Sequence, residues 1–161
     1  MKTIDRSAAI LALTLSAWAL APVPALAADT PSTDAAPTVA VRMDAARKFI
    51  TEKNWRDAIS ELRIAVRDEP KNADAHNLLA YSFRKQAKPD LDKAFEHYKI
   101  ALKLNPKHLG AHEYIGEAYL MAHKPDEAKK HLAELEKICG NKTCEEYEDL
   151  AKAIAAYKPK A

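Results

Sequence analysis

The sequence predicts an all-α protein, an α-solenoid of three stacked helix pairs closed by one C-terminal capping helix. Composition favours helix, because the 161 residues include only three glycines, and alanine, lysine, glutamate and leucine dominate after residue 40. Small residues also recur in register, since Ala58, Ala94 and Ala128 lie 36 and 34 residues apart. A period of this length is typical of helical solenoids.

The repeat extends to both halves of each unit. In the second halves, bulky, apolar and turn-forming residues follow the alanines at fixed offsets: Leu62, Tyr98 and Leu132, then Ala65, Ala101 and Leu135, then Pro70, Pro106 and Gly140. In the first halves, small residues are each followed three positions later by an aromatic: Ala46 and Phe49, Ala80 and Phe83, Gly116 and Tyr119. We expect the small residues where the two helices of a unit cross, because a large side chain would hold the backbones apart. One unit cannot bury its apolar face alone, so neighbours must stack.

Local signals place each helix in turn. Trp55 starts the second helix beside a turn and is expected to pack between the two helices of its unit, and Pro70 ends that helix. Asp90 or Asp92 is expected to cap the fourth, after a link that is two residues longer than its counterparts. Pro125 opens the sixth, where its missing N–H costs nothing. The expected helices cover 41–52, 55–68, 73–86, a segment ending at 104, 109–122, 125–138 and 144–157.

The N-terminal segment reads as a secretory signal peptide over residues 1–27. Lys2 and Arg6 precede an uncharged, largely apolar run from Ala8 to Leu20, which is too short for a comfortable membrane span, and a small-x-small site ends at Ala27. An uncleaved anchor is the alternative. Residues 28–40 are expected to form a disordered linker. The repeats are then expected over 41–72, 73–106 and 107–140, with a capping helix at 144–157 and a frayed tail at 158–161.

The repeated segment resembles the tetratricopeptide repeat (TPR) family. The likeness rests on the stretch from Asn72 to Phe83, continuing to Ala94, Tyr98, Ala101 and Asn105–Pro106, and on matching residues in the first and third units. It implies a right-handed solenoid and a non-catalytic module that binds a protein or peptide, an adaptor or assembly factor. With the signal peptide, it points to a protein exported to the periplasm of a Gram-negative bacterium.

The resemblance also implies a concave groove as the binding surface. Carried onto this sequence, the resemblance predicts these partner-binding groove residues: Met43, Arg47, Asn77, Tyr81, Arg84, Lys85, Glu113, Glu117, Met121 and Glu148. The groove would be basic at one end and acidic at the other. Chaperone-binding members hold a peptide carboxylate with a basic clamp, but the corresponding positions here are Met43, Arg47, Leu78, Gly110 and Tyr114, so that clamp is absent.

Catalytic and cofactor motifs are not found in the sequence. There is no serine elbow, glycine-rich phosphate loop or His-Glu-x-x-His, so no enzyme activity and no cofactor are expected. His76 and His112 occupy equivalent positions and are expected to pack; His108 and His112 could share a metal if His108 were helical; His97, His123 and His131 complete the set. A metal site needs three or four convergent ligands, which no spacing here delivers. The formal charge of +2 gives no reason to expect nucleic acid.

Cys139 and Cys144 are the only cysteines. Behind a signal peptide, such a pair is expected to form a disulfide that joins the third helix pair to the capping helix. Two other functions stay open: a redox-handling or metal-handling role for this pair, and a structural subunit that packs its convex face into an envelope complex.

Overall fold

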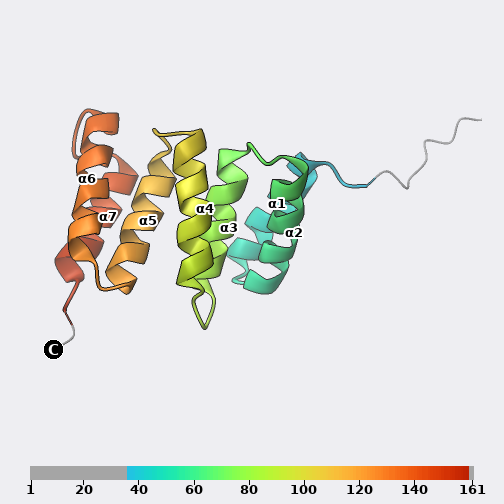
Figure 1. Ribbon diagram of the computed structural model, residues 1–161, viewed down its shortest axis with the longest axis horizontal. Helices are drawn as coiled ribbons and strands as arrows, with labels where there is room; N and C mark the ends of the chain where they lie inside the picture. The colour runs from blue at the N-terminus through green and yellow to red at the C-terminus, as the bar shows by residue number, and fades with distance from the viewer. Residues whose placement is uncertain (1–35, 160–161) are drawn as a thin grey trace, which may run out of the picture. The chain divides into compact units, whose positions relative to one another are not determined.

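The computed structural model describes residues 36–159, and all regular secondary structure within them is helical. Figure 1 shows the helices side by side along the long axis of the array. They are α1 (Val39–Thr51), α2 (Trp55–Asp68), α3 (Ala73–Lys85), α4 (Leu91–Leu104), α5 (Leu109–Met121), α6 (Pro125–Cys139) and α7 (Glu145–Ala156). Three helix pairs and a final helix confirm the predicted all-α solenoid.

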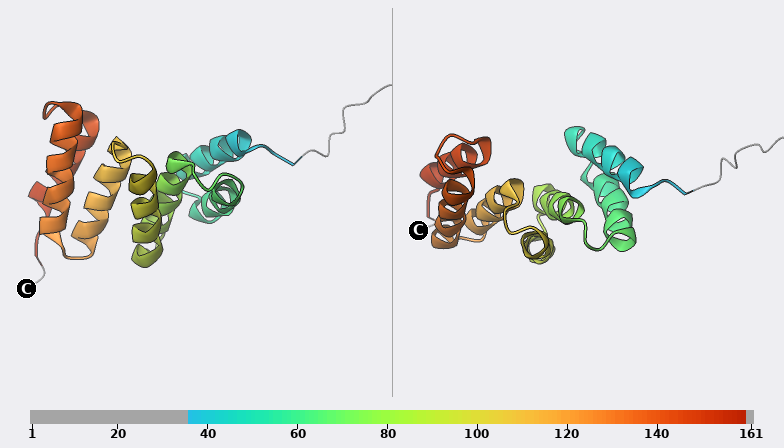
Figure 2. Two further views of the ribbon diagram at one scale, coloured as in Figure 1. Left: turned by 45° about the horizontal axis from the view of Figure 1, so that its top comes forward. Right: turned by 90° about the horizontal axis from the view of Figure 1, so that it is seen from above.

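The helices alternate between two sides of the array. Seen from above, α1, α3, α5 and α7 lie on the inner side of a bend, and α2, α4 and α6 lie on the outer side (Figure 2). We call these sides the inner face and the outer face. Each inner helix packs on the outer helix that follows it, and α7 packs on both α5 and α6. The last helix therefore covers the third pair, as a capping helix should.

Small residues form the spine of the core. Ala46, Ala58, Ala80, Ala94 and Ala128 are all completely buried, as expected of residues at helix crossings. Tyr98 and Leu62, the bulky residues four positions after two of these alanines, are completely buried as well. The packing thus uses the residues whose spacing defined the repeat.

The turn inside each pair explains the extra two residues of the second unit. In the first and third pairs the turn is three residues long, with Lys53 and His123 in the left-handed region at φ 57° and 58°. The amides of Asn54 and Lys124 then donate to the carbonyls of Phe49 and Tyr119, each at 2.8 Å. In the second pair the longer link reaches the same closure, because the Asp90 amide donates to the Phe83 carbonyl at 3.1 Å.

Capping side chains set most helix starts. The side chains of Asn54, Asn72, Asp90 and His108 each accept a hydrogen bond from the backbone amide three residues later. Asp90, rather than Asp92, is therefore the cap of α4. Thr38 caps α1 in the same way, so that helix begins at Val39 and the predicted linker ends two residues too late. The predicted signal peptide and residues 28–35 of the predicted linker lie outside the described residues.

Two residues make contacts that the repeat pattern did not predict. A Cβ atom added at Gly116 would lie 2.6 Å from Leu150 of α7, so this glycine makes room for the capping helix. The ring of Trp55 meets the ring of Tyr81 on α3 edge-on, with centroids 6.1 Å apart. Trp55 thus joins the first unit to the second.

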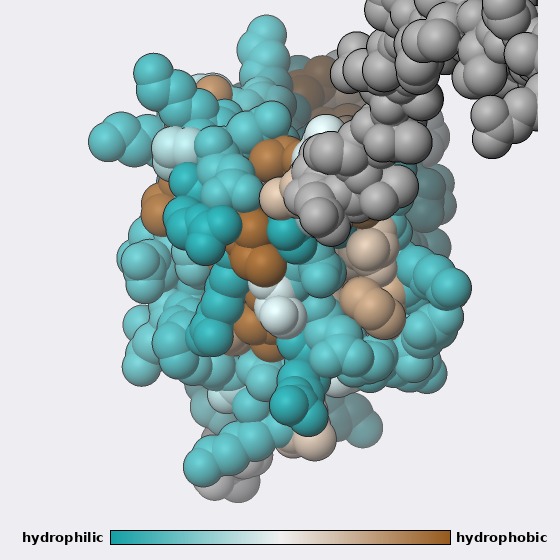
Figure 3. Space-filling model, turned by 90° about the vertical axis from the view of Figure 1, so that its right-hand side faces the viewer, coloured by the Kyte–Doolittle hydropathy of each residue, from teal (hydrophilic) through white to brown (hydrophobic). Residues whose placement is uncertain are grey.

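The array ends differ in how they cover apolar side chains. Figure 3 shows brown, apolar patches among hydrophilic side chains on the face at the α1–α2 end. Val41 on α1 is 56 % exposed, whereas Leu150 on α7 is completely buried. None of the helices within residues 36–159 has the length and apolar character needed to cross a membrane.

Candidate functional site

A buried arginine lies at the centre of the inner face. Arg84 of α3 is only 4 % exposed, and its Nε donates to the hydroxyl of Tyr98 at 3.3 Å. Its Nη2 forms an ion pair with Oε2 of Glu117 on α5, at 2.5 Å. Burial raises the pKa of the Tyr98 hydroxyl, although the guanidinium opposes the shift. Arg84 therefore ties α4 and α5 to α3.

An aromatic row runs across the same face. Beyond the Trp55–Tyr81 contact, the Tyr81 and Tyr114 rings lie 4.8 Å apart between α3 and α5. The Arg84 guanidinium lies over both tyrosines, 5.3 Å from the centroid of Tyr81 and 5.6 Å from that of Tyr114. Burial, and then the charge of Glu113, raise the pKa of Tyr114 to about 12. Three aromatic side chains from three helices thus form a continuous rigid surface.

Glu113 of α5 is the unusual charge of this face. It is 9 % exposed, and its carboxyl group takes part in no hydrogen bond or ion pair with the described residues. Burial raises its pKa to about 8, and the nearby carboxylates of Glu117, Asp149 and Glu146 add to the shift while Arg84 opposes it. Glu113 is therefore largely protonated at neutral pH, and it is poised to ionise when a cation approaches.

The predicted groove residues divide by burial. Four of them are buried, namely Met43, Asn77, Arg84 and Glu113; Tyr81 and Glu117 are half-buried; and Arg47, Lys85, Met121 and Glu148 are exposed. Met43 belongs to the hydrophobic core, so it offers no surface to a partner. Asn77 differs in that its Oδ1 is buried without a hydrogen-bond partner. The structure brings Tyr81, Arg84, Glu113 and Glu117 together, whereas Arg47 and Glu148 lie on the first and last inner helices.

Sequence reasoning missed several residues of this site. The sequence predicts that Trp55 packs between the two helices of its own unit, and it shows Tyr114 only as a position of the absent clamp. In the structure both belong to the aromatic row. Tyr98 is part of the repeat pattern, but that pattern does not show that its hydroxyl is the hydrogen-bond partner of Arg84. The spacing of Tyr81 and Arg84 on one helix was visible in the sequence, whereas the side chains that reach them come from other helices.

The histidines do not form a metal cluster within residues 36–159. His108 is the cap of α5 and not part of it, and its Nε2 lies 3.0 Å from Asp74 Oδ1, so it does not share a ligand with His112. Nδ1 of His123 lies 3.3 Å from the hydroxyl of Tyr157. His76 and His112 pack as expected, and each meets a second histidine from the following helix.

The outer face carries hollows of its own. One cavity of about 590 Å³ lies between α2 and α4, with Arg56, Arg63 and Lys93 around Phe83. A second, of about 510 Å³, lies at the equivalent place between α4 and the third pair and holds Asp92, Glu96 and Lys99. Neither is lined by a predicted groove residue, so the outer face is a rival to the inner face as a surface for a partner.

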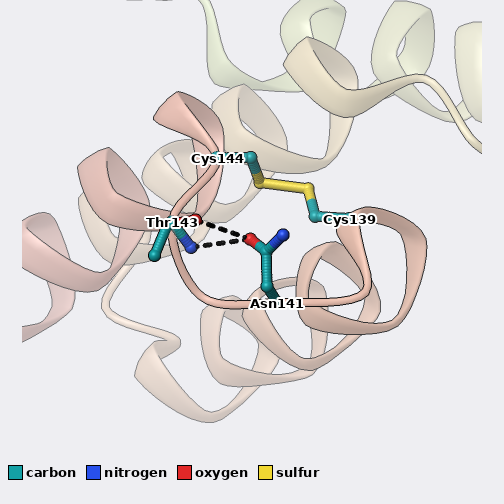
Figure 4. Close-up of a disulfide and its surroundings, with 4 residues drawn as sticks. All are labelled: Cys139, Asn141, Thr143 and Cys144. Atoms are coloured by element: carbon teal, nitrogen blue, oxygen red, sulfur yellow. Dashed lines mark hydrogen bonds between the residues drawn. A yellow bond between two sulfur atoms is a disulfide. The ribbon is translucent and has the colours of Figure 1, made fainter.

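The predicted disulfide is confirmed. Cys139 at the end of α6 and Cys144 at the cap of α7 are joined, with their Cα atoms 6.3 Å apart (Figure 4). Gly140 turns the chain with φ 71°. The Asn141 side-chain oxygen accepts from the amide and the hydroxyl of Thr143, both at 2.9 Å. The bridge fixes the start of α7 against the third pair.

Reduction of this disulfide is expected to loosen α7 first. The closed loop is short, so the loss of stability should be modest, about 2 kcal/mol. Because Leu150 is the contact that Gly116 makes room for, undocking of α7 would uncover the third pair while leaving α1 to α4 folded. Hydrogen exchange with and without reductant measures this. Exchange in α7 that is unchanged by reductant, or that rises equally in α1 and α2, would contradict it.

A family model for the tetratricopeptide repeat matches residues 43–102, the part of the chain that carries the first two helix pairs. Over these residues the chain is similar to tetratricopeptide repeats. The match includes Tyr81, Arg84 and Tyr98, so the TPR residues of the second unit also build the inner-face cluster. As a class, the TPR fold is a protein-interaction module.

Solved structures share the fold of this chain at low sequence identity. The first TPR of Spaghetti (RPAP3) bound to the HSP90 peptide SRMEEVD is 19 % identical, with a TM-score of 0.62 over 73 % of this chain and 94 % of that one. The NMR structure of the first TPR domain of human RPAP3 is 19 % identical, with a TM-score of 0.62 over 74 % and 94 %. MamA MSR-1 C2 is 19 % identical, with a TM-score of 0.57 over 64 % and 58 %. No curated protein sequence matches the chain.

Proposed function

We propose that this protein is a non-catalytic module that holds a segment of another protein on its inner face, as an adaptor or assembly factor in the periplasm. The fold supports the general role. The compartment is supported by the signal-peptide pattern over residues 1–27 and by the disulfide, because disulfides persist in oxidising compartments. One TPR neighbour is bound to a peptide, which supports a peptide-like segment as ligand.

Glu113 is the single observation that carries the proposal furthest. Its side chain is mostly buried and has no cationic partner among the described residues, so ionising its carboxyl group is costly until a cation pairs with it. Tyr81 and Tyr114 supply rigid apolar surface beside it, and such aromatic side chains are enriched among binding hot spots. The partner segment is therefore one that places a lysine or arginine against Glu113 and apolar groups against the tyrosines.

The sign of the pH dependence follows from the pKa of Glu113. Because this pKa is about 8, the free protein holds a proton on the Glu113 carboxyl group at neutral pH. Pairing with a cation must release that proton. Affinity for a basic segment should therefore rise as the pH increases from 6 to 8 and then level off. Glu113→Gln, which keeps the shape and removes the titration, should abolish this rise.

Peptide binding measured by fluorescence anisotropy tests the proposal. A basic peptide selected from a synthetic array is compared with its Lys→Gln version, on wild type and on Glu113→Gln. Glu113→Gln should weaken the basic peptide by about tenfold and leave its Lys→Gln version unchanged. Tyr81→Ala should weaken both peptides by about tenfold or more. Lys99→Ala, on the outer face, is the matched control and should change neither.

A different pattern of variant effects would show that the partner binds to the outer face. If Tyr81→Ala and Glu113→Gln bind like wild type while Arg63→Ala abolishes binding, the partner docks on the outer face. The chain would then act as the structural subunit whose outer surface is covered.

A further inference from the structure

The second and third helix pairs each contain a histidine–histidine contact at the same place. Nδ1 of His76 on α3 lies 3.0 Å from Nδ1 of His97 on α4. Nδ1 of His112 on α5 lies 2.9 Å from Nδ1 of His131 on α6. The outer-helix rings are also stacked alike, His97 on Phe83 and His131 on Tyr119. The same three-residue arrangement therefore occurs twice.

Backbone carbonyls determine where the protons sit. Nε2 of His76 lies 3.2 Å from the Pro70 carbonyl, and Nε2 of His112 lies 3.0 Å from the Pro106 carbonyl. Since a carbonyl oxygen only accepts, each Nε2 carries hydrogen, and in the neutral ring Nδ1 is then an acceptor. The Nδ1–H groups of His97 and His131 are therefore the donors within the pairs.

This arrangement is matched to neutral rings. One added proton can enter a pair at the free Nε2 of the outer histidine without breaking the contact. A second must enter at Nδ1 of His76 or His112, which places two N–H groups face to face at about 3 Å between two like charges. The doubly protonated pair must separate.

The first helix pair holds a different contact at the corresponding positions. Residues 34 before His76 and 36 before His97 are Arg42 and Glu61, and Arg42 Nη1 donates to Glu61 Oε2 at 2.8 Å. An arginine–glutamate pair is charged and complementary throughout the range in which histidine titrates. The chain thus contains its own acid-resistant version of the contact.

We propose that the His76–His97 and His112–His131 pairs are acid-sensitive latches, which hold the second and third helix pairs closed at neutral pH and loosen them in mild acid while the first pair stays closed. The device depends only on the fold, so it stands independently of the partner that the inner face binds.

Groups around the latches modify this response without reversing it. Burial lowers the pKa of His76. The pKa of His97 is lowered by burial, by the ring of His76 and by Arg63 of α2. Glu96 of α4 opposes both shifts. Burial and the neighbouring His112 lower the pKa of His131 to about 4, and Lys130 of α6 acts in the same direction. Glu127 and Glu134 oppose this shift. Lys93 lies over Phe83, the ring on which His97 stacks.

The sign of the stability change follows. Because these pKa values are lower in the folded state than the usual 6.5, the unfolded chain binds more protons. Stability from the latches is complete above about pH 6.5 and declines as the pH falls toward 4. Glu113 acts in the opposite direction, since its pKa is raised, so the latches must be compared in variants that all retain it.

Transplanting the first-pair contact is the direct test. A variant with His76→Arg, His97→Glu, His112→Arg and His131→Glu is compared with wild type by thermal unfolding at pH 7.5 and 5.0. The wild-type midpoint should fall by about 10 °C between these values. In the transplanted variant, the fall should be less than half as large. In wild type, protection from hydrogen exchange should decrease between pH 7.5 and 5.0 more in α3 to α6 than in α1 and α2.

A milder variant keeps the test decisive if the transplant does not fold. His97→Gln with His131→Gln retains an amide donor to each inner histidine and removes the outer titration, so it too should lose acid sensitivity. His123→Gln, outside both pairs, should keep it. A wild-type midpoint equal at pH 7.5 and 5.0, or an equal fall in the Gln variant and in His123→Gln, overturns the proposal.

Discussion

Arg84→Ala is expected to lower the free energy of unfolding by about 2–4 kcal/mol. The substitution leaves the hydroxyl of Tyr98 buried without its donor and leaves Glu117 without its cation. It also removes the guanidinium from above two tyrosine rings. The Glu117 side chain is 28 % exposed, so water can relieve part of the cost. Urea unfolding followed by circular dichroism measures the change.

The neighbouring residue supplies the control for Arg84. Lys85 is exposed on the same turn of α3, with its ammonium 5.8 Å from the Tyr81 centroid, so Lys85→Ala should cost no more than about 0.5 kcal/mol. Equal stability of the two variants would show that Arg84 is a surface residue. Because Arg84 is buried, we expect that an Arg84→Glu substitution would alter partner binding mainly by destabilising the fold, and only secondarily by changing the charge of the groove.

Ala94→Leu and Gly116→Leu are expected to destabilise the array by about 1–3 kcal/mol or more. Ala94 is completely buried in α4, so a larger side chain must push α3 and α4 apart. At Gly116 even a Cβ atom would lie 2.6 Å from Leu150, so the added side chain must displace α7. The two variants should therefore differ in which part of the chain loosens first.

Ala87→Leu is the matched control for these two substitutions. Ala87 lies exposed in the longer link between α3 and α4, where an added side chain meets solvent. Its melting temperature should stay within about 2 °C of the wild-type value. Equal melting temperatures for all three variants would mean that the repeat register is wrong.

Periodicity was sufficient to predict the fold. Local signals placed the helix ends within about two residues, because Asn54, Asn72 and Asp90 act on their own helices and need no distant partner. The role of Gly116 could not be found in this way. A small residue indicates a close approach, but its partner, Leu150, belongs to a segment that breaks the repeat pattern.

The candidate site was predictable only in part. The resemblance to the TPR family placed Tyr81, Arg84 and Glu117 in a groove on the inner helices, and the structure brings them together. Spacing does not distinguish a buried side chain from an exposed one, because burial depends on how far the next helix leans across it. Arg84 and Lys85 illustrate this, since they are adjacent in sequence, and only Arg84 is covered. The histidine pairs were equally hidden, because each is formed by two helices.

Site-specific photocross-linking tests the central claim, that the inner face holds the partner. A photoreactive phenylalanine analogue is placed at Lys85 on the inner face and, as matched control, at Lys99 on the outer face, since both positions are exposed. After irradiation in a periplasmic extract, the account predicts a discrete adduct from position 85 that diminishes in the Tyr81→Ala background, and none from position 99. An adduct formed from position 99 alone would contradict it.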